Sequence, residues 1–164
     1  MKTLVFNTSS SLFLVKIGLI PKILQHFRVI TSPEIEKEMK QGAELGYKDA
    51  TMIAQFIAEQ KIKVVDTRTS REMAKNFNLK EVDASVVALA QERSAIAATE
   101  DKQIEKICIA TATPVVNTAV LLYTLWKEQE LKSEQAYVLL DLLLRQGYNK
   151  EICLKIKEKI MEES

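Results

Sequence analysis

The chain has few of the residues that interrupt regular structure. Only four of its 164 residues are glycine and three are proline, which favours helices joined by short loops. No glycine-rich loop follows the first apolar run, at residues 4–6. A Rossmann-like site for a nucleotide or a phosphate group is therefore disfavoured.

Cysteine and histidine are also scarce. Cys108 and Cys153 both lie in apolar, helical-looking segments and lack the spacing of a zinc site. We interpret them as buried thiols in a reducing cytoplasm. His26 is the single histidine, and we interpret it as structural. An acid–base relay built on histidine is therefore not expected.

Neither sign of charge is in excess, since 23 Lys and Arg residues face 22 Asp and Glu residues. No global field indicates a nucleic acid or a membrane as partner, so any contact with nucleic acid must come from a local patch. No run approaches the roughly 20 apolar residues of a membrane span. The polar NTSSS after MKTLVF is not typical of a signal peptide. We expect a cytoplasmic protein without a membrane partner.

Length and composition predict one globular domain. A hydrophobic fraction of 47% and a charged fraction of 27% are ordinary for a folded protein, and 164 residues suffice for one layered core but are few for two. We assign residues 1–164 to a single domain. Within it, residues 1–118 form an α/β core and residues 119–164 a helical extension.

Apolar runs alternate with amphipathic helical segments along the core. Such alternation indicates parallel strands joined by right-handed helical crossovers, and hence a three-layer α/β/α sandwich with a mainly parallel sheet of about five strands. Three further helices are expected between residues 118 and 160. The predicted strands are residues 4–6, 28–31, 61–66, 95–98 and 114–116.

Two capping signals predict where helices begin. Ser32 and Pro33 supply a capping hydroxyl and a proline at the first helical position, so a helix is expected from Pro33. Asn78 with Glu81 three residues later predicts a capping box for the following helix. The first helix is expected to begin only at Leu12, after the polar NTSSS stretch.

Acidic side chains are expected to converge at one edge of this sheet. The carboxyl ends of parallel strands share an edge, so Glu100 and Asp101 after the fourth strand lie near the end of the first. Glu38 and Asp83, each close to the start of a helix, can reach the same cleft. Converging carboxylates favour Mg²⁺ or Mn²⁺, which activates water and stabilises charge on a phosphodiester.

Four segments in this order resemble the PIN domain, especially archaeal and bacterial PIN-like proteins with extra C-terminal helices. The resemblance implies a metal-dependent endoribonuclease of the kind found in VapC-type toxins of toxin–antitoxin pairs. It implies Glu38, Asp83 and Asp101 as catalytic acids, with Glu100 as an alternate in the last motif. The segments are LVFNTSSSLFLV, ITSPEIEKEM, KEVDASVVALAQE and AIAATEDKQIEKICIATATPVVNTAVLL.

Asn7 departs from the family pattern, which usually has aspartate at this position. The resemblance implies that Asp83 and Asp101 bind the metal with Asn7, and that the Thr8 hydroxyl steadies the first loop. An amide still offers its carbonyl oxygen to a cation, but it has no negative charge and cannot act as a base. We therefore expect weakened or conditional activity; the alternative is a catalytically inactive binding module of the same fold.

Each of these residues also has a structural interpretation. Asn7 could bond to the turn after the first strand, and Asp101 could cap the helix that follows it. Asp83 could be favoured by the helix dipole alone. Glu38 could be a solvated surface residue. The sequence leaves both interpretations open.

The expected partners follow from the resemblance and from the C-terminal segment. The resemblance implies single-stranded RNA as substrate and an antitoxin protein as partner. Leucines are abundant between residues 139 and 144, and helices that are apolar on more than one face usually pack against a partner. We therefore predict a homodimer.

Overall fold

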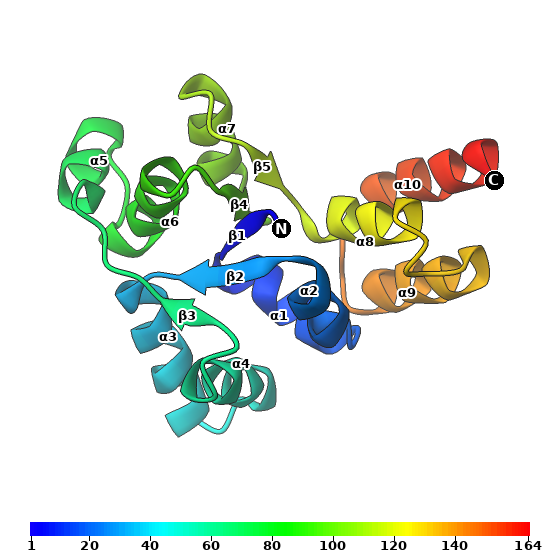
Figure 1. Cartoon of the computed structure of the whole chain (residues 1–164), viewed down its shortest axis with the longest axis horizontal. Coiled ribbons are helices and arrows are strands. Elements are labelled where there is room, and N and C mark those ends of the chain that lie inside the picture. The colour runs from blue at the N-terminus through cyan, green and yellow to red at the C-terminus, as the bar shows by residue number, and fades with distance from the viewer.

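A computed structural model describes residues 1–164 and contains one five-stranded sheet (Figure 1). All neighbouring strands are parallel and lie in the order β3-β2-β1-β4-β5. The predicted fold class is therefore confirmed. The strands are β1 (Thr3–Phe6), β2 (Arg28–Thr31), β3 (Lys63–Val64), β4 (Ile96–Ala98) and β5 (Val115–Val116).

Helices cover both faces of the sheet, because the connections run outward from its centre in opposite directions. Right-handed crossovers then place α1–α4 on one face and α5–α7 on the other (Figure 1). These helices are α1 (Thr8–Lys16), α2 (Ile20–His26), α3 (Pro33–Glu44), α4 (Lys48–Ala58), α5 (Ser70–Phe77), α6 (Glu81–Glu92) and α7 (Lys102–Ala110).

The C-terminal segment forms the three predicted helices, α8 (Thr118–Lys127), α9 (Ser133–Arg145) and α10 (Lys150–Glu163), which lie together at one side of the molecule (Figure 1). The buried residues of these helices and of β1 belong to one hydrophobic cluster. This cluster includes residues from Leu4 to Ile160. Packing of α8 against α1, and of the three helices against one another, stabilises the extension. None of the ten helices is both long enough and apolar enough to cross a membrane.

Small residues let α6 pack closely on the central strands. Every residue from Ala84 to Ala90 is buried, and Ala97 and Ala98 of β4 are fully inaccessible. Alanine brings the helix backbone near the sheet without leaving a cavity. The start of α6, which carries Asp83, is thereby fixed above the carboxyl edge.

Two predicted helix boundaries were wrong. Helix α1 begins at Thr8, not at Leu12, because Asn7 is its N-cap residue and the Asn7 carbonyl accepts the Ser11 N–H (3.2 Å), so the polar stretch forms the first helical turn. Asn78 does not form a capping box with Glu81. It adopts the left-handed conformation at φ 52° and ends α5, a role in which asparagine is tolerated, and α6 begins after Lys80.

Glu92, the last residue of α6, holds the segment that leads into the neighbouring α5. Its carboxylate accepts hydrogen bonds from the backbone N–H of Arg68 (2.9 Å) and from the N–H (3.2 Å) and hydroxyl (2.8 Å) of Thr69. Partial burial alone would raise the pKa of Glu92. These bonds outweigh burial and lower it.

We expect Glu92→Ala to lower the free energy of unfolding by about 1 kcal/mol at pH 7, because Arg68 and Thr69, just before α5, lose their hydrogen-bond acceptor. A lowered pKa in the folded state gives stability that is present above the unfolded-state pKa and is lost as pH falls through the folded-state pKa. Denaturant unfolding at pH 7 and at acidic pH measures this. The difference in free energy of unfolding between variant and wild type should disappear at acidic pH. A Glu162→Ala control should unfold like wild type at both pH values.

Candidate active site at the carboxyl edge of the sheet

The order of the strands reverses between β1 and β4, and the crevice beyond such a point is where α/β sheets bind ligands. The residues that follow the two strands lie side by side there. The Asn7 N–H donates to the Ala98 carbonyl (3.0 Å), and the Thr99 N–H donates to the Val116 carbonyl of β5 (3.0 Å). Asn7 and the Thr99–Asp101 loop therefore meet, as the sequence predicted.

The Asn7 side chain is 5% exposed and bonds to two hydroxyl groups. Its Nδ2 donates to Thr99 Oγ1 (2.8 Å) and, at longer range, to Ser9 Oγ (3.4 Å). Its Oδ1 accepts no hydrogen bond from the protein and is not among the inaccessible polar atoms. The carbonyl oxygen of Asn7 is thus free to bind water or a cation.

Both hydroxyl partners of Asn7 also hold the loop after β4. Thr99 Oγ1 accepts the Asp101 N–H (3.0 Å), and Ser9 Oγ accepts the Glu100 N–H (3.0 Å). A hydroxyl carries one proton and two lone pairs, so each can still donate its own proton. A carboxylate at position 7 could accept both protons without disturbing either backbone bond.

Three of the predicted acids converge on this edge. Asp83 lies half-buried in the first turn of α6, and it makes no hydrogen bond within the protein. Its burial, followed by the negative charges of Asp101 and Glu38, raises the pKa of the Asp83 carboxyl, while Lys80 opposes this. The charges of Asp101 and of Glu38 therefore both disfavour the ionised form of Asp83.

Asp101 and Glu38 are held in different ways. Asp101 caps α7, where its Oδ1 accepts the N–H groups of Gln103 (2.9 Å) and Ile104 (3.0 Å), so the capping role is present and Oδ2 stays free. Glu38 is exposed on α3. That helix is tied to α6 by a hydrogen bond between Ser32 Oγ and Ser85 Oγ (2.7 Å), which sets the position of Glu38 relative to Asp83.

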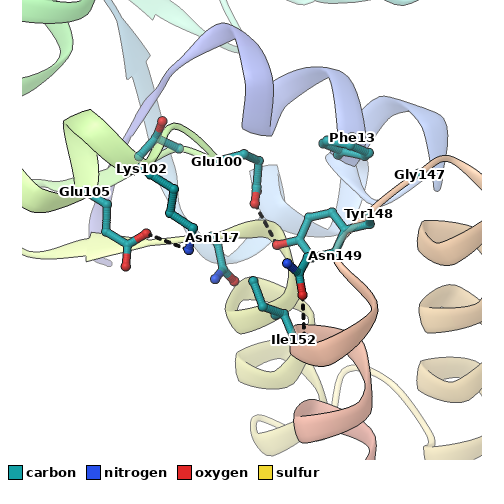
Figure 2. A pocket seen from close by; sticks show the side chains of 10 residues that line it. Phe13, Glu100, Lys102, Glu105, Asn117, Gly147, Tyr148, Asn149 and Ile152 are labelled. Carbon is teal, nitrogen blue, oxygen red and sulfur yellow. Dashed lines mark hydrogen bonds and ion pairs between the residues drawn. The ribbon is translucent and has the colours of Figure 1, made fainter.

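Glu100 points toward Tyr148 and the C-terminal helices (Figure 2). Its carboxylate accepts the N–H (2.7 Å) and hydroxyl (2.6 Å) of Thr118 and the Tyr148 hydroxyl (2.7 Å). Burial raises the pKa of Glu100, although these three donors oppose the shift. With its acceptors occupied, Glu100 anchors α8 and the α9–α10 loop to the end of β4.

The first loop is held by Ser9. The Thr8 hydroxyl, which the resemblance assigned to this task, is buried without a partner, whereas Ser9 Oγ bonds to Asn7 and Glu100. The sequence does not predict the role of Ser9, because three consecutive serines give no sign of which one faces the loop. Nor does it predict the contact of Tyr148 with Glu100, which are separated by 48 residues of chain.

The chain belongs to the PIN-domain family, because the model of the PIN-domain family DUF3368 matches residues 3–162. The crystal structure of PAE2754 from Pyrobaculum aerophilum is similar in fold, with a TM-score of 0.53 and 18% sequence identity. The match covers 77% of this chain and 96% of that chain. No curated protein is similar enough to this chain to count as a match. The PIN resemblance of the sequence is thereby confirmed.

PIN domains have a nuclease-type fold and typically use a divalent metal ion. The unbonded oxygens at this edge, on Asp83, Asp101 and Asn7, are hard donors that suit Mg²⁺ or Mn²⁺. No three His, Cys, Asp or Glu side chains form a group that could hold a metal ion. Mg²⁺ usually needs only one or two carboxylates and completes its shell with water and substrate phosphate, so the donor set fits the ion.

Proposed function

We propose that this protein is a Mg²⁺- or Mn²⁺-dependent endoribonuclease of single-stranded RNA, with activity weakened or made conditional by Asn7. The observation that carries the proposal is the placement of Asp83 in the first turn of α6, of Asp101 at the start of α7 and of Asn7 after β1 at one edge of the sheet. Burial of Asp83, followed by the charges of Asp101 and Glu38, raises the pKa of its carboxyl. Mutual repulsion of this kind opposes folding, and a bound cation would relieve it.

Each residue has a role in this proposal. Asp83 and Asp101 would bind the ion through carboxylate oxygens, and Asn7 would add a neutral carbonyl oxygen. When bound, the ion supplies an activated water and stabilises charge on the phosphodiester. Glu38, exposed on α3, would complete the site or orient water. Thr99 and Ser9 keep Asn7 and the Asp101 loop in place.

The proposal also covers the biological role, the location, the partners and the domain organisation of the protein. We propose a toxin-like role in the cytoplasm with an antitoxin as partner, and a single domain whose core is residues 1–118 with an extension over 119–164. A homodimer is proposed as well. Large apolar side chains are exposed on α9 and α10, with Val138 at 59%, Leu154 at 45% and Met161 at 61%, and their exposure supports the homodimer.

The rival proposal is a catalytically inactive PIN module that binds a partner. The amide at position 7 and the lack of a group of three metal-ligating side chains favour it. It predicts that Mn²⁺ leaves the melting temperature of the wild-type protein unchanged and that no RNA is cleaved.

We expect Asp83→Asn to separate the two proposals. Without metal the variant should be as stable as wild type or more stable, because a half-buried charge beside two other acids is removed. In wild type, Mn²⁺ at 100 times its Kd should stabilise the fold by about 2.7 kcal/mol. In the variant this gain should disappear, and RNA cleavage should fall by at least about 10- to 100-fold.

The matched control is Glu81→Gln, which removes an exposed carboxylate from the same helical turn. Thermal melts and calorimetric titration with Mn²⁺ should show this control responding like wild type. A clear loss of stability in metal-free Asp83→Asn, with the Mn²⁺ response intact, would instead assign Asp83 to a capping or packing role.

A further inference from the structure

A recess lies beside the acidic edge, where the Asp101 loop meets the C-terminal helices (Figure 2). It has a volume of about 210 Å³. This is below the range of about 300–1,000 Å³ typical of pockets for drug-sized ligands, so it suits a single ring system. Its lining residues are Phe13, Thr99, Glu100, Lys102, Glu105, Asn117, Gly147, Tyr148, Asn149 and Ile152.

Two side-chain amides give the pocket hydrogen-bond donors. Asn117 Oδ1 accepts the Val120 N–H (2.8 Å), and Asn149 Oδ1 accepts the Ile152 N–H (3.0 Å), so each carbonyl is used to cap a helix. Each Nδ2 group has no hydrogen-bond acceptor within the protein. These two NH₂ groups are held in fixed orientations by the caps and are available to a ligand.

The other walls supply an acceptor and apolar surface. Figure 2 shows Lys102 and Asn117 on one side of the space, and Tyr148 and Ile152 on the other. The Glu105 carboxylate interacts with the Lys102 ammonium at 3.4 Å, an exposed pair that is readily rearranged. The rings of Phe13 and Tyr148 pack edge to face, with centroids 5.1 Å apart, behind the polar groups.

The charges of the lining argue against a phosphate group. Lys102 is the single cation, whereas Glu100 and Glu105 are both carboxylates. A nucleobase suits the pocket better, because it is flat and uncharged and carries both carbonyl acceptors and N–H donors on its edge. Cytosine is one example, since its N4 amino group can donate a hydrogen bond to a carboxylate such as that of Glu105.

We propose that this pocket binds an unpaired nucleobase of an RNA strand whose backbone passes Asp101. This inference rests on the proposed ribonuclease function and names where the strand is held. Glu100 and Lys102, the neighbours of Asp101 in the chain, both line the pocket. A base seated there therefore belongs to a nucleotide close to the phosphodiester at the acidic edge.

The test is a titration of the full-length, ¹⁵N-labelled protein with cytidine 5′-monophosphate, followed by NMR in the presence of EDTA. We expect saturable shifts of the amide signals of residues 147–152 and Asn117, and none with ribose 5-phosphate. Equal shifts with both compounds would show that the pocket recognises the ribose phosphate. Shifts with neither compound would show that the pocket does not bind a nucleobase. Either result would overturn the proposal.

Asn117→Asp and Asn149→Asp are the decisive variants. Each keeps the oxygen that caps its helix but replaces the NH₂ donor with an acceptor, so the fold is retained and the affinity for cytidine 5′-monophosphate should fall about tenfold. Asn76→Asp, on exposed α5, makes the same chemical change far from the pocket and should bind normally. Unchanged affinity in both pocket variants would overturn the proposal.

Because this titration contains no metal and measures no cleavage, its outcome is separate from that of the ribonuclease proposal. Base binding without Mn²⁺-dependent RNA cleavage would leave the pocket assigned and refute the ribonuclease. Cleavage without base binding would do the reverse.

Discussion

Asn7→Asp is expected to make the metal-free protein less stable and the metal-bound protein more active. The new carboxylate joins Asp83, Asp101 and Glu38, and a rise of one pKa unit among such groups corresponds to about 1.4 kcal/mol of lost stability at neutral pH. Mn²⁺ should recover this loss and more, since it binds the folded state. Thermal melts with and without Mn²⁺, together with cleavage of single-stranded RNA, measure both effects.

The hydrogen bonds around Asn7 explain why the fold should accept this change. Thr99 and Ser9 can each turn a hydroxyl proton toward the carboxylate while still accepting a backbone N–H. The loss of stability should therefore come from charge repulsion alone. It should shrink in an Asp83→Asn background, because the two substitutions share that interaction.

Asn76→Asp is the control for charge on the exposed surface, and it should change neither stability nor metal response. An equal loss of stability in Asn7→Asp at zero and at millimolar Mn²⁺, with no gain in cleavage, would show that the amide is needed to hold the turn. Asn7 would then be structural and not the remnant of a catalytic aspartate.

Glu100→Ala should be the most destabilising single change at this edge, lowering the free energy of unfolding by about 3 kcal/mol. The substitution leaves the Thr118 N–H and hydroxyl and the Tyr148 hydroxyl without their acceptor in a half-buried site. Denaturant unfolding measures the loss. Amide hydrogen exchange should accelerate across α8–α10, because Glu100 connects these helices to β4.

Two comparison variants test this explanation. Glu100→Gln keeps an oxygen for Thr118 and presents an NH₂ to the Tyr148 hydroxyl, which can rotate to accept it, so its loss should stay near 1 kcal/mol. Glu105→Ala removes a carboxylate that makes only a surface ion pair and should lose less than about 1 kcal/mol. Similar losses in all three variants would contradict a role for Glu100 as an anchor.

The fold was predictable because its signals are local. Apolar runs such as residues 4–6 and 28–31 match β1 and β2, and the start of α3 at Pro33 follows from Ser32 and proline alone. Where the apolar pattern is weaker, the sequence predicts a longer strand than the structure contains. Residues 61–66 were predicted as a strand, but only Lys63 and Val64 pair with β2 at the edge of the sheet.

The site was only partly predictable, because its details depend on side-chain direction. The sequence order of the motifs brings Asp83, Asp101 and Glu38 to one edge, but it does not show that Glu100 turns toward the C-terminal helices. That orientation depends on Thr118 and Tyr148, which lie 18 and 48 residues further along the chain. Contacts at such separations leave no local pattern in the sequence.

The link between Glu100 and Tyr148 also sets an order of assembly during synthesis. Chains grow from the N-terminus at about 5–20 residues per second, so Tyr148 is added roughly 2 to 6 seconds after Val116 completes the last strand. Until then the carboxylate of Glu100 has no phenol to bind, and the recess beside Asp101 lacks the wall formed by residues 147–152. A growing chain therefore lacks the complete recess until residues 147–152 have been added.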